Sequence, residues 1–262
     1  MKEIILKVIS QPTVGLEAEN IAPKVFACKS SMEIAGLPIY EGNRERRLGD
    51  FFDVSGEAGE AEAETRIVIE GDVRLTKRIG QGMRAGEIHI KGSAGMHLGS
   101  KMRGGKVTVE GDCEAFCFQE MRGGVVHIKG NAGNYLGSAT RGNWRGMRGG
   151  TITVDGNAGS EIATFMKGGK IHVKGDCASF AGVHMNKGFI VIDGRAERRI
   201  GAEMIGGTIV ANEVEAMLAG FKPVETVKDP EIESEKFTGN YKKYSGDHAD
   251  SRAKGTVWVK IQ

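Results

Sequence analysis

The chain has 262 residues, which is enough for one large domain or two small ones with a buried core. Its 36 lysines and arginines nearly balance its 34 aspartates and glutamates, so charge gives no reason to expect binding to nucleic acid or to a membrane surface. No apolar stretch is long enough to span a bilayer, and the N-terminal MKEIILKV is too short for a secretion signal. We therefore expect a cytoplasmic protein.

Glycine is the unusual feature of the composition. The chain contains 40 glycines, about twice the ordinary share, without the period of collagen. Together with many short apolar strands, this excess indicates a repetitive all-β structure with tight turns.

The N-terminal residues 1–61 do not follow any period, and we expect them to form a capping segment. The ends of stacked repeats expose unpaired strand edges, which such segments cover. A weak first repeat follows, with a predicted strand in TRIVIEG at 65–71.

A repeat of 19 residues then runs through the predicted repeat region, residues 62–221. Its clearest marker is a methionine, followed three residues later by a glycine. The seven methionines are Met83, Met102, Met121, Met147, Met166, Met185 and Met204. One interval is 26 residues because of a seven-residue insertion near 140–146.

Each methionine also precedes a short strand of alternating apolar residues, such as Val107-Thr108-Val109, and a glycine closes this strand in six of the seven repeats. Alternation places the first and third side chains on one face and the second on the other. A unit of 19 residues is too short for a propeller blade or a helical hairpin. It fits one coil of a solenoid, in which equal positions stack roughly 4.8 Å apart. The sequence predicts a right-handed parallel β-helix of seven or eight coils.

The C-terminal residues 222–262 leave the period. They are polar and irregular before a last β-like TVWVKI, and we expect a cap or an extended arm rather than a second enzyme domain.

The cysteines and histidines give little sign of chemistry. Cys113 and Cys177 share a position that is alanine in other coils, and Cys117 shares one with leucine and isoleucine, so all three are expected in the core. Three coils separate Cys113 from Cys177, roughly 14 Å, which is too far for a disulfide. The role of Cys28 is undetermined. Three histidines occupy the outward middle position of the strands, namely His89, His127 and His172.

Two charged rows are more informative. The position after the strand alternates in sign, as in Lys91, Glu110 and Lys129, which is typical of a solvated surface with cross-strand pairs. The position after each methionine is cationic in five coils: Arg84, Arg103, Arg122, Arg148 and Lys167. These cations repel one another unless corner carbonyls, carboxylates or an acidic partner lie against them.

The insertion carries Arg141, Trp144 and Arg145, a composition found at interface anchors. It either contacts a partner or folds back on its own coil. With the cationic row, these residues form the candidate partner interface. No catalytic, cofactor-binding or metal-binding residue is predicted in this chain.

The glycine-rich turns resemble the β-helix domain of the glutamate synthase large subunit. The spacing is seen at Gly92/Gly95/Gly99 and Gly130/Gly133/Gly137, although Glu114 and Phe118 replace two glycines in one coil. With GNRERRLGDFFDVSGEAGE at 42–60 and the YSGDHAD tail, the whole chain resembles the C subunit of formylmethanofuran dehydrogenase.

The resemblance implies a scaffold subunit in a complex that reversibly reduces CO2 and joins it to methanofuran, the entry step of methanogenesis. It implies that a tungsten- or molybdenum-pterin subunit, iron–sulfur subunits and an amidohydrolase-like subunit with a dinuclear metal site carry the chemistry. Three alternatives remain: the C subunit of the related bacterial formyltransferase/hydrolase complex, a split glutamate synthase-like domain, and a free-standing β-helix enzyme acting on polysaccharides. The last is disfavoured because the outward strand position carries no carboxylate.

Overall fold

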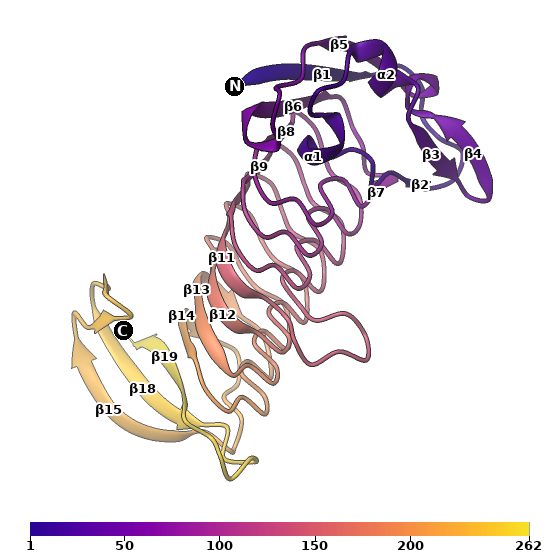
Figure 1. The fold of residues 1–262 in the computed structure, drawn as a ribbon. Helices are drawn as coiled ribbons and strands as arrows, with labels where there is room; N and C mark the ends of the chain where they lie inside the picture. Colours follow the sequence, from indigo (N-terminus) through magenta and orange to yellow (C-terminus); the bar gives the residue numbers. More distant parts are fainter. Residues whose placement is uncertain (262) are drawn as a thin grey trace.

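The computed structural model describes residues 1–261 and is dominated by β-strands, most of which join one mixed sheet of 13 strands. Its strand order is β15-β18-β19-β14-β13-β12-β11-β10-β9-β8-β6-β1-β5. The sheet extends along the molecule, with the N-terminal segment at one end and the C-terminal strands at the other (Figure 1). Among residues 1–261, no helix is both long and apolar enough to cross a membrane.

The elements follow in chain order. The N-terminal segment contains β1 (Lys2–Val8), β2 (Leu16–Glu17), α1 (Pro23–Phe26), α2 (Ser31–Ala35), β3 (Pro38–Glu41), β4 (Arg44–Arg47), η1 (Leu48–Asp50), β5 (Phe52–Gly56) and η2 (Glu62–Glu64). The repeats supply β6 (Thr65–Glu70), β7 (Thr76–Lys77), β8 (Glu87–Ile90), β9 (Lys106–Val109), β10 (Val125–Ile128), β11 (Arg148–Val154), β12 (Lys167–Val173), β13 (Lys187–Ala196) and β14 (Thr208–Val214). The remainder forms β15 (Lys222–Lys228), β16 (Glu231–Ile232), β17 (Glu235–Lys236), β18 (Asn240–Gly246) and β19 (Gly255–Ile261).

The strands of successive repeats pair in parallel, each with the equivalent strand of the next repeat. Ile88 lies opposite Val107 in β9, and Val126 lies opposite Ile152 across the insertion. The pairing therefore follows the predicted spacing. Because the backbone groups of these strands bond to neighbours on both sides, the repeats stack into one continuous body (Figure 1).

A second parallel ladder consists of single bridges between small residues. It runs through Val73, Ala94, Cys113, Ala132, Ala158, Cys177 and Ala196. Cys113, Cys117 and Cys177 are free and buried, as predicted, while Cys28 is exposed. Burial raises the pKa of the Cys177 thiol to about 12 and also raises the pKa of Cys113.

These thiols differ in their expected reactivity. At about pH 8 in the native state, we expect an aromatic disulfide reagent to modify Cys28 quickly and to leave the other three cysteines unmodified, because only a thiolate that the reagent can reach attacks it. Counting released chromophore before and after denaturation checks this. Fast modification of more than one thiol in the folded chain would contradict the burial of this ladder.

The seven repeat methionines are all fully buried, which confirms their predicted inward position. The first six interlock with a glycine of the following repeat. The Cε atom of Met121, for example, lies 2.6 Å from the point where a side chain on Gly150 would begin, and Gly150 has a φ of +88°. The methionine thus fills the space that the missing Cβ leaves. Steric interlock between neighbouring repeats explains why methionine and glycine recur together.

Both ends of the stack are extended by strands from outside the repeats. At the N-terminal end β1 adds to β6 in parallel and β5 adds to β1 antiparallel. At the other end β19 adds to β14 in parallel, followed by the antiparallel strands β18 and β15. Gly255 at the start of β19 receives the side chain of Met204, so the C-terminal segment completes the last interlock.

The outward strand position behaves differently at the C-terminal end. The alternation predicts that the middle residue of every repeat strand lies on the solvent side, but Val191 and Val210 are buried. The β16–β17 hairpin covers them, and they form an apolar cluster with Ile232 and Trp258. The prediction is wrong there because a segment distant in sequence lies over the outer face of the sheet.

Candidate partner-binding surface

The buried methionines lie on one edge of the stack, flanked by two rows of residues. The row after the methionines starts with the five predicted cations and continues with Asn186 and Ile205. Backbone hydrogen bonds hold this row in register. After its first member, each N–H donates to the carbonyl of the methionine one repeat earlier, as Arg103 does to Met83 at 2.7 Å. We call this surface the methionine edge and its five cations the cationic row.

The cationic row is largely open to solvent. Arg84, Arg103, Arg122 and Lys167 are exposed, and Arg148 is half-buried. Within residues 1–261, none of these five side chains makes an ion pair with a carboxylate or donates a hydrogen bond to a corner carbonyl. The row therefore carries positive charge that no group in this part of the chain neutralises by direct contact.

Arg148 has an electrostatically unfavourable environment. Its Nε is buried without a hydrogen-bond partner in the described residues. Burial lowers the pKa of the Arg148 guanidinium, and repulsion from Arg122 lowers it further. An uncompensated buried donor costs stability. The repulsion between stacked cations and the burial of Arg148 Nε therefore both destabilise the row, and the rest of the fold offsets this cost.

The residues directly before the methionines, such as Lys101 and Phe165, also lie on the methionine edge. Two grooves run along this edge. The first, the cationic groove, has a volume of about 500 Å³ and is lined by Lys24, Glu62, Gln81, Gly82, Arg84, Lys101 and Arg103. The second, the tryptophan groove, has a volume of about 530 Å³ and is lined by Trp144, Phe165, Lys167, His184, Asn186, Glu203, Ile205, Asp250 and Arg252.

The insertion projects outward from the stack (Figure 1), and its Trp144 lines the tryptophan groove. Its base is attached, because Asn143 Nδ2 donates to Glu120 Oε1 at 2.9 Å and Gly146 N–H donates to the Phe165 carbonyl. Arg141, Trp144 and Arg145 are nevertheless exposed, and Trp144 is 68% exposed. The loop is thus held to the stack at its base and presents its large side chains to solvent.

Most residues that line the two grooves were not predicted as interface from the sequence, among them Lys24, Lys101, Phe165 and Ile205. Lys101 and Phe165 directly precede methionines, so the position before each methionine could have been predicted to share the surface of the cationic row. Lys24 lies outside the repeat, and no pattern could place it there.

The alternating charges on the sheet face differ from the cationic row, since they pair with one another. Lys129 contacts Glu110 at 2.6 Å and Lys174 contacts Asp155 at 2.7 Å. The outward histidines join the same ladder, as His89 Nε2 lies 2.8 Å from Glu110 Oε1. This face is a surface whose charges are satisfied, as predicted from their alternation.

The charge ladder makes stability depend on acidity. Hydrogen bonds from Lys129 and then His89 lower the pKa of Glu110 below its usual value. A carboxyl with a depressed folded-state pKa contributes stability above its unfolded pKa and loses it as the pH falls through the folded pKa. We expect Glu110→Gln to flatten the loss of stability from about pH 6 to about pH 3 in denaturant titrations.

Glu19→Gln is the matched control, because Glu19 is exposed and has no ion pair among residues 1–261. If the two variants have the same pH profile, the ladder does not contribute to acid sensitivity.

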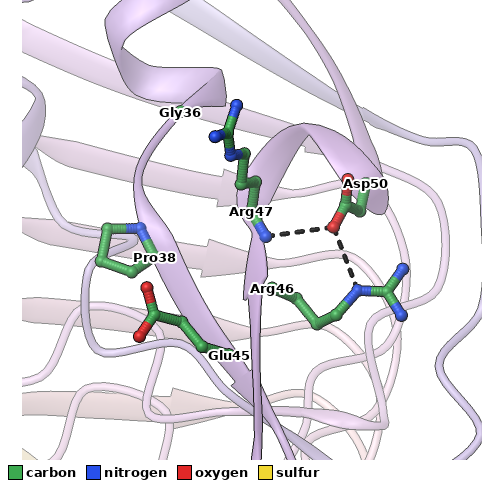
Figure 2. Close-up of a pocket in the computed structure, with 6 residues that line it drawn as sticks. All are labelled: Gly36, Pro38, Glu45, Arg46, Arg47 and Asp50. Atoms are coloured by element: carbon green, nitrogen blue, oxygen red, sulfur yellow. Dashed lines mark hydrogen bonds and ion pairs between the residues drawn. The ribbon is translucent and has the colours of Figure 1, made fainter.

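A third cleft of about 810 Å³ lies at the N-terminal end, beside β4 and η1 (Figure 2). Asp50 accepts hydrogen bonds there from Arg47 N–H at 3.1 Å and Arg46 Nε at 3.0 Å, which lowers the pKa of its carboxyl. Arg46 also contacts Glu41 and lies over the Phe51 ring. These polar groups largely satisfy one another, which indicates that they hold β4 and η1 together.

The described residues, 1–261, do not fit a metal site. Among residues 1–261, no three histidine, cysteine, aspartate or glutamate side chains come close enough together to hold an ion.

No family model matches the chain. Curated proteins do match it along its full length. It is 53% identical over 262 residues to the C subunit of the tungsten-containing formylmethanofuran dehydrogenase 2 of Methanothermobacter thermautotrophicus, covering 100% of this chain and 97% of that protein. The corresponding protein of Methanococcus maripaludis is 42% identical, with 100% and 98% covered. The chain belongs to the family of formylmethanofuran dehydrogenase C subunits.

Other members of this C-subunit family match over shorter stretches. The C subunit of the molybdenum-containing formylmethanofuran dehydrogenase 1 of Methanosarcina barkeri is 46% identical over 98 residues, 37% of this chain and 33% of that protein. Among solved structures, a chain of the formyltransferase/hydrolase complex of Methylorubrum extorquens, crystallised with methylofuran, superposes with a TM-score of 0.86. It is 25% identical, with 98% of this chain and 100% of that chain covered.

Proposed function

We propose that this chain is the scaffold of a formylmethanofuran dehydrogenase, an oxidoreductase complex, and that it holds the catalytic subunits in place without doing chemistry itself. The observation that carries the proposal is the full-length identity of 53% to the C subunit of such a complex. The cationic row supports it, because a row of unsatisfied charge on a rigid stack is suited to binding other chains. The complex would reversibly reduce CO2 and join it to methanofuran.

The architecture suits this role. We propose that the repeats form a right-handed parallel β-helix of seven or eight coils over residues 62–221, with 1–61 and 222–262 as its caps. The continuous parallel ladder from β6 to β14 supports this assignment. A stack in which every coil is bonded to the next bends little, so partners bound at different coils keep a fixed separation.

The proposed partners are a pterin-metal subunit, an amidohydrolase-like subunit with a dinuclear metal site, and iron–sulfur subunits, all in the cytoplasm. The metals would belong to those chains, since the donor groups among residues 1–261 of this one do not fit a metal site. We propose the tungsten form of the enzyme, because three relatives named for tungsten match along the whole chain, although a fourth matches 38% of it, while those named for molybdenum match about a third.

The bacterial formyltransferase/hydrolase complex is a second candidate, favoured by the TM-score of 0.86. Its identity of 25% against 53% makes the dehydrogenase the better assignment.

Anaerobic affinity purification of the tagged full-length chain from its native host tests the proposal. We expect mass spectrometry to identify a pterin-metal subunit and an amidohydrolase-like subunit, and metal analysis to find tungsten and iron in the same fraction. Partners without tungsten, molybdenum or iron–sulfur clusters would favour the bacterial type of complex. Recovery of the folded chain alone would refute the scaffold role.

A further inference from the structure

The two grooves are parts of one continuous edge. Arg84 and Arg103 of the cationic row line the cationic groove, while Lys167 of the same row lines the tryptophan groove together with Asn186 and Ile205. Arg122 and Arg148 of the row lie between them in chain order, and Trp144 of the insertion belongs to the tryptophan groove. One ligand lying along the methionine edge would therefore contact both grooves.

The cationic groove carries an excess of positive charge. Four of its lining residues are cations: Lys24, Arg84, Lys101 and Arg103. The one carboxylate, Glu62, is already engaged, because its Oε1 accepts hydrogen bonds from the backbone N–H groups of Arg84 and Ala85 at 2.7 and 3.2 Å. A groove of this composition attracts carboxylates.

The tryptophan groove has a different character. Trp144 is 68% exposed, and the Phe165 and His184 rings stack with centroids 4.5 Å apart. The charges of this lining balance, because it holds two carboxylates and two cations, and Asp250 pairs with Arg252 at 2.6 Å. A uniform polyanion would match the charge of the first groove but not the balanced charges and aromatic rings of the second, whereas a polypeptide can change its side chains along its length.

We propose that the methionine edge binds one extended acidic segment of a partner protein, with acidic side chains on the cationic groove and row and an apolar or aromatic side chain beside Trp144. From Arg84 to Ile205 there are six repeat steps, roughly 29 Å, which about nine residues of extended chain can span. This inference rests on the proposed function, since it names the surface by which the scaffold holds one of its partners.

Reversal of the row charges tests the inference in the assembled complex. The double variant Arg103→Glu/Arg122→Glu is expected to lower the recovery of that partner with the tagged chain by at least about tenfold, because like charges then face each other. The matched control is Lys222→Glu/Lys228→Glu on β15, which reverses the same number of exposed charges away from the methionine edge. The control should recover every partner normally.

A second measurement does not depend on the variants. In the wild-type complex, a zero-length carbodiimide reagent should link Lys101 or Lys167 to aspartates or glutamates within one short stretch of a partner. Links from these lysines to scattered sites, or none while other lysines are linked, would overturn the inference.

The outcomes separate the two proposals. If the wild-type chain recovers no partner, the scaffold role itself fails. If both double variants recover all partners equally, the scaffold role stands and the methionine edge is not the binding surface. Binding of free poly-glutamate as strongly as the partner, unaffected by Trp144→Ala, would show a nonspecific anion site and would also overturn the inference.

Discussion

Replacement of Gly150 by alanine is expected to lower the free energy of unfolding of the isolated chain by more than about 3 kcal/mol. Two physical effects act together. A Cβ at this position would lie 2.7 Å from the Gly124 carbonyl oxygen and 2.6 Å from Met121 Cε. The backbone also has a φ of +88°, which L-residues other than glycine rarely adopt. The ladder holds both backbones in place, so neither can move away cheaply.

The chain supplies a control that separates these effects. Gly142 in the insertion has a similar φ of +81°, but nothing lies within 4 Å of where its Cβ would be. Gly142→Ala is therefore expected to cost only about 1 kcal/mol, the contribution of the backbone conformation alone. Chemical denaturation followed by circular dichroism measures both variants. Equal losses would show that close packing between repeats is not what requires glycine at 150.

The second large effect is expected at the methionines. Met121→Ala should destabilise the chain by about 2–5 kcal/mol, because it removes a fully buried side chain and leaves a cavity beside Gly150. Met121→Leu keeps most of the volume and should cost less than about 1.5 kcal/mol. Denaturant midpoints of the two variants report the difference.

Met32→Ala serves as the control for this change, since Met32 lies in α2 and is 84% exposed. It should leave the stability almost unchanged. A loss at Met32 as large as that at Met121 would contradict the assignment of the repeat methionines to the core.

The periodic part of the fold was predictable from sequence because each repeat solves the same packing problem. The methionine position, the inward positions of the strands and the small position of Cys113 and Cys177 are confirmed, since stacking forces equal positions to have equal surroundings. The interlock was visible only as a recurring pair, methionine and glycine. Its cause is the contact between one repeat and the next, which only the three-dimensional structure shows.

The nonperiodic parts were less predictable. Nothing in the sequence indicates that β19 pairs with β14, because the two strands are separated by the β15–β18 segment. For the same reason, the burial of Val191 and Val210 beneath the β16–β17 hairpin could not be read from their own repeat. Long-range contacts of this kind depend on where a distant segment returns.

The candidate surface was predictable in part. The cationic row follows from spacing alone, but a sequence cannot show whether carboxylates or carbonyls lie against its charges. The structure leaves Arg103 and Arg122 exposed and Arg148 Nε without a partner among residues 1–261. The sequence shows that these residues are cations, but it does not show that no carboxylate or carbonyl in the described part of the chain lies against them.

The claim that this chain is a scaffold is tested most directly by native mass spectrometry of the complex purified with and without it. In a host strain depleted of the chain, we expect the pterin-metal subunit and the amidohydrolase-like subunit to be recovered separately, each still folded and loaded with its metal. Re-expression of the chain should restore one assembly. If the two subunits remain together without it, the chain is not what holds them in place.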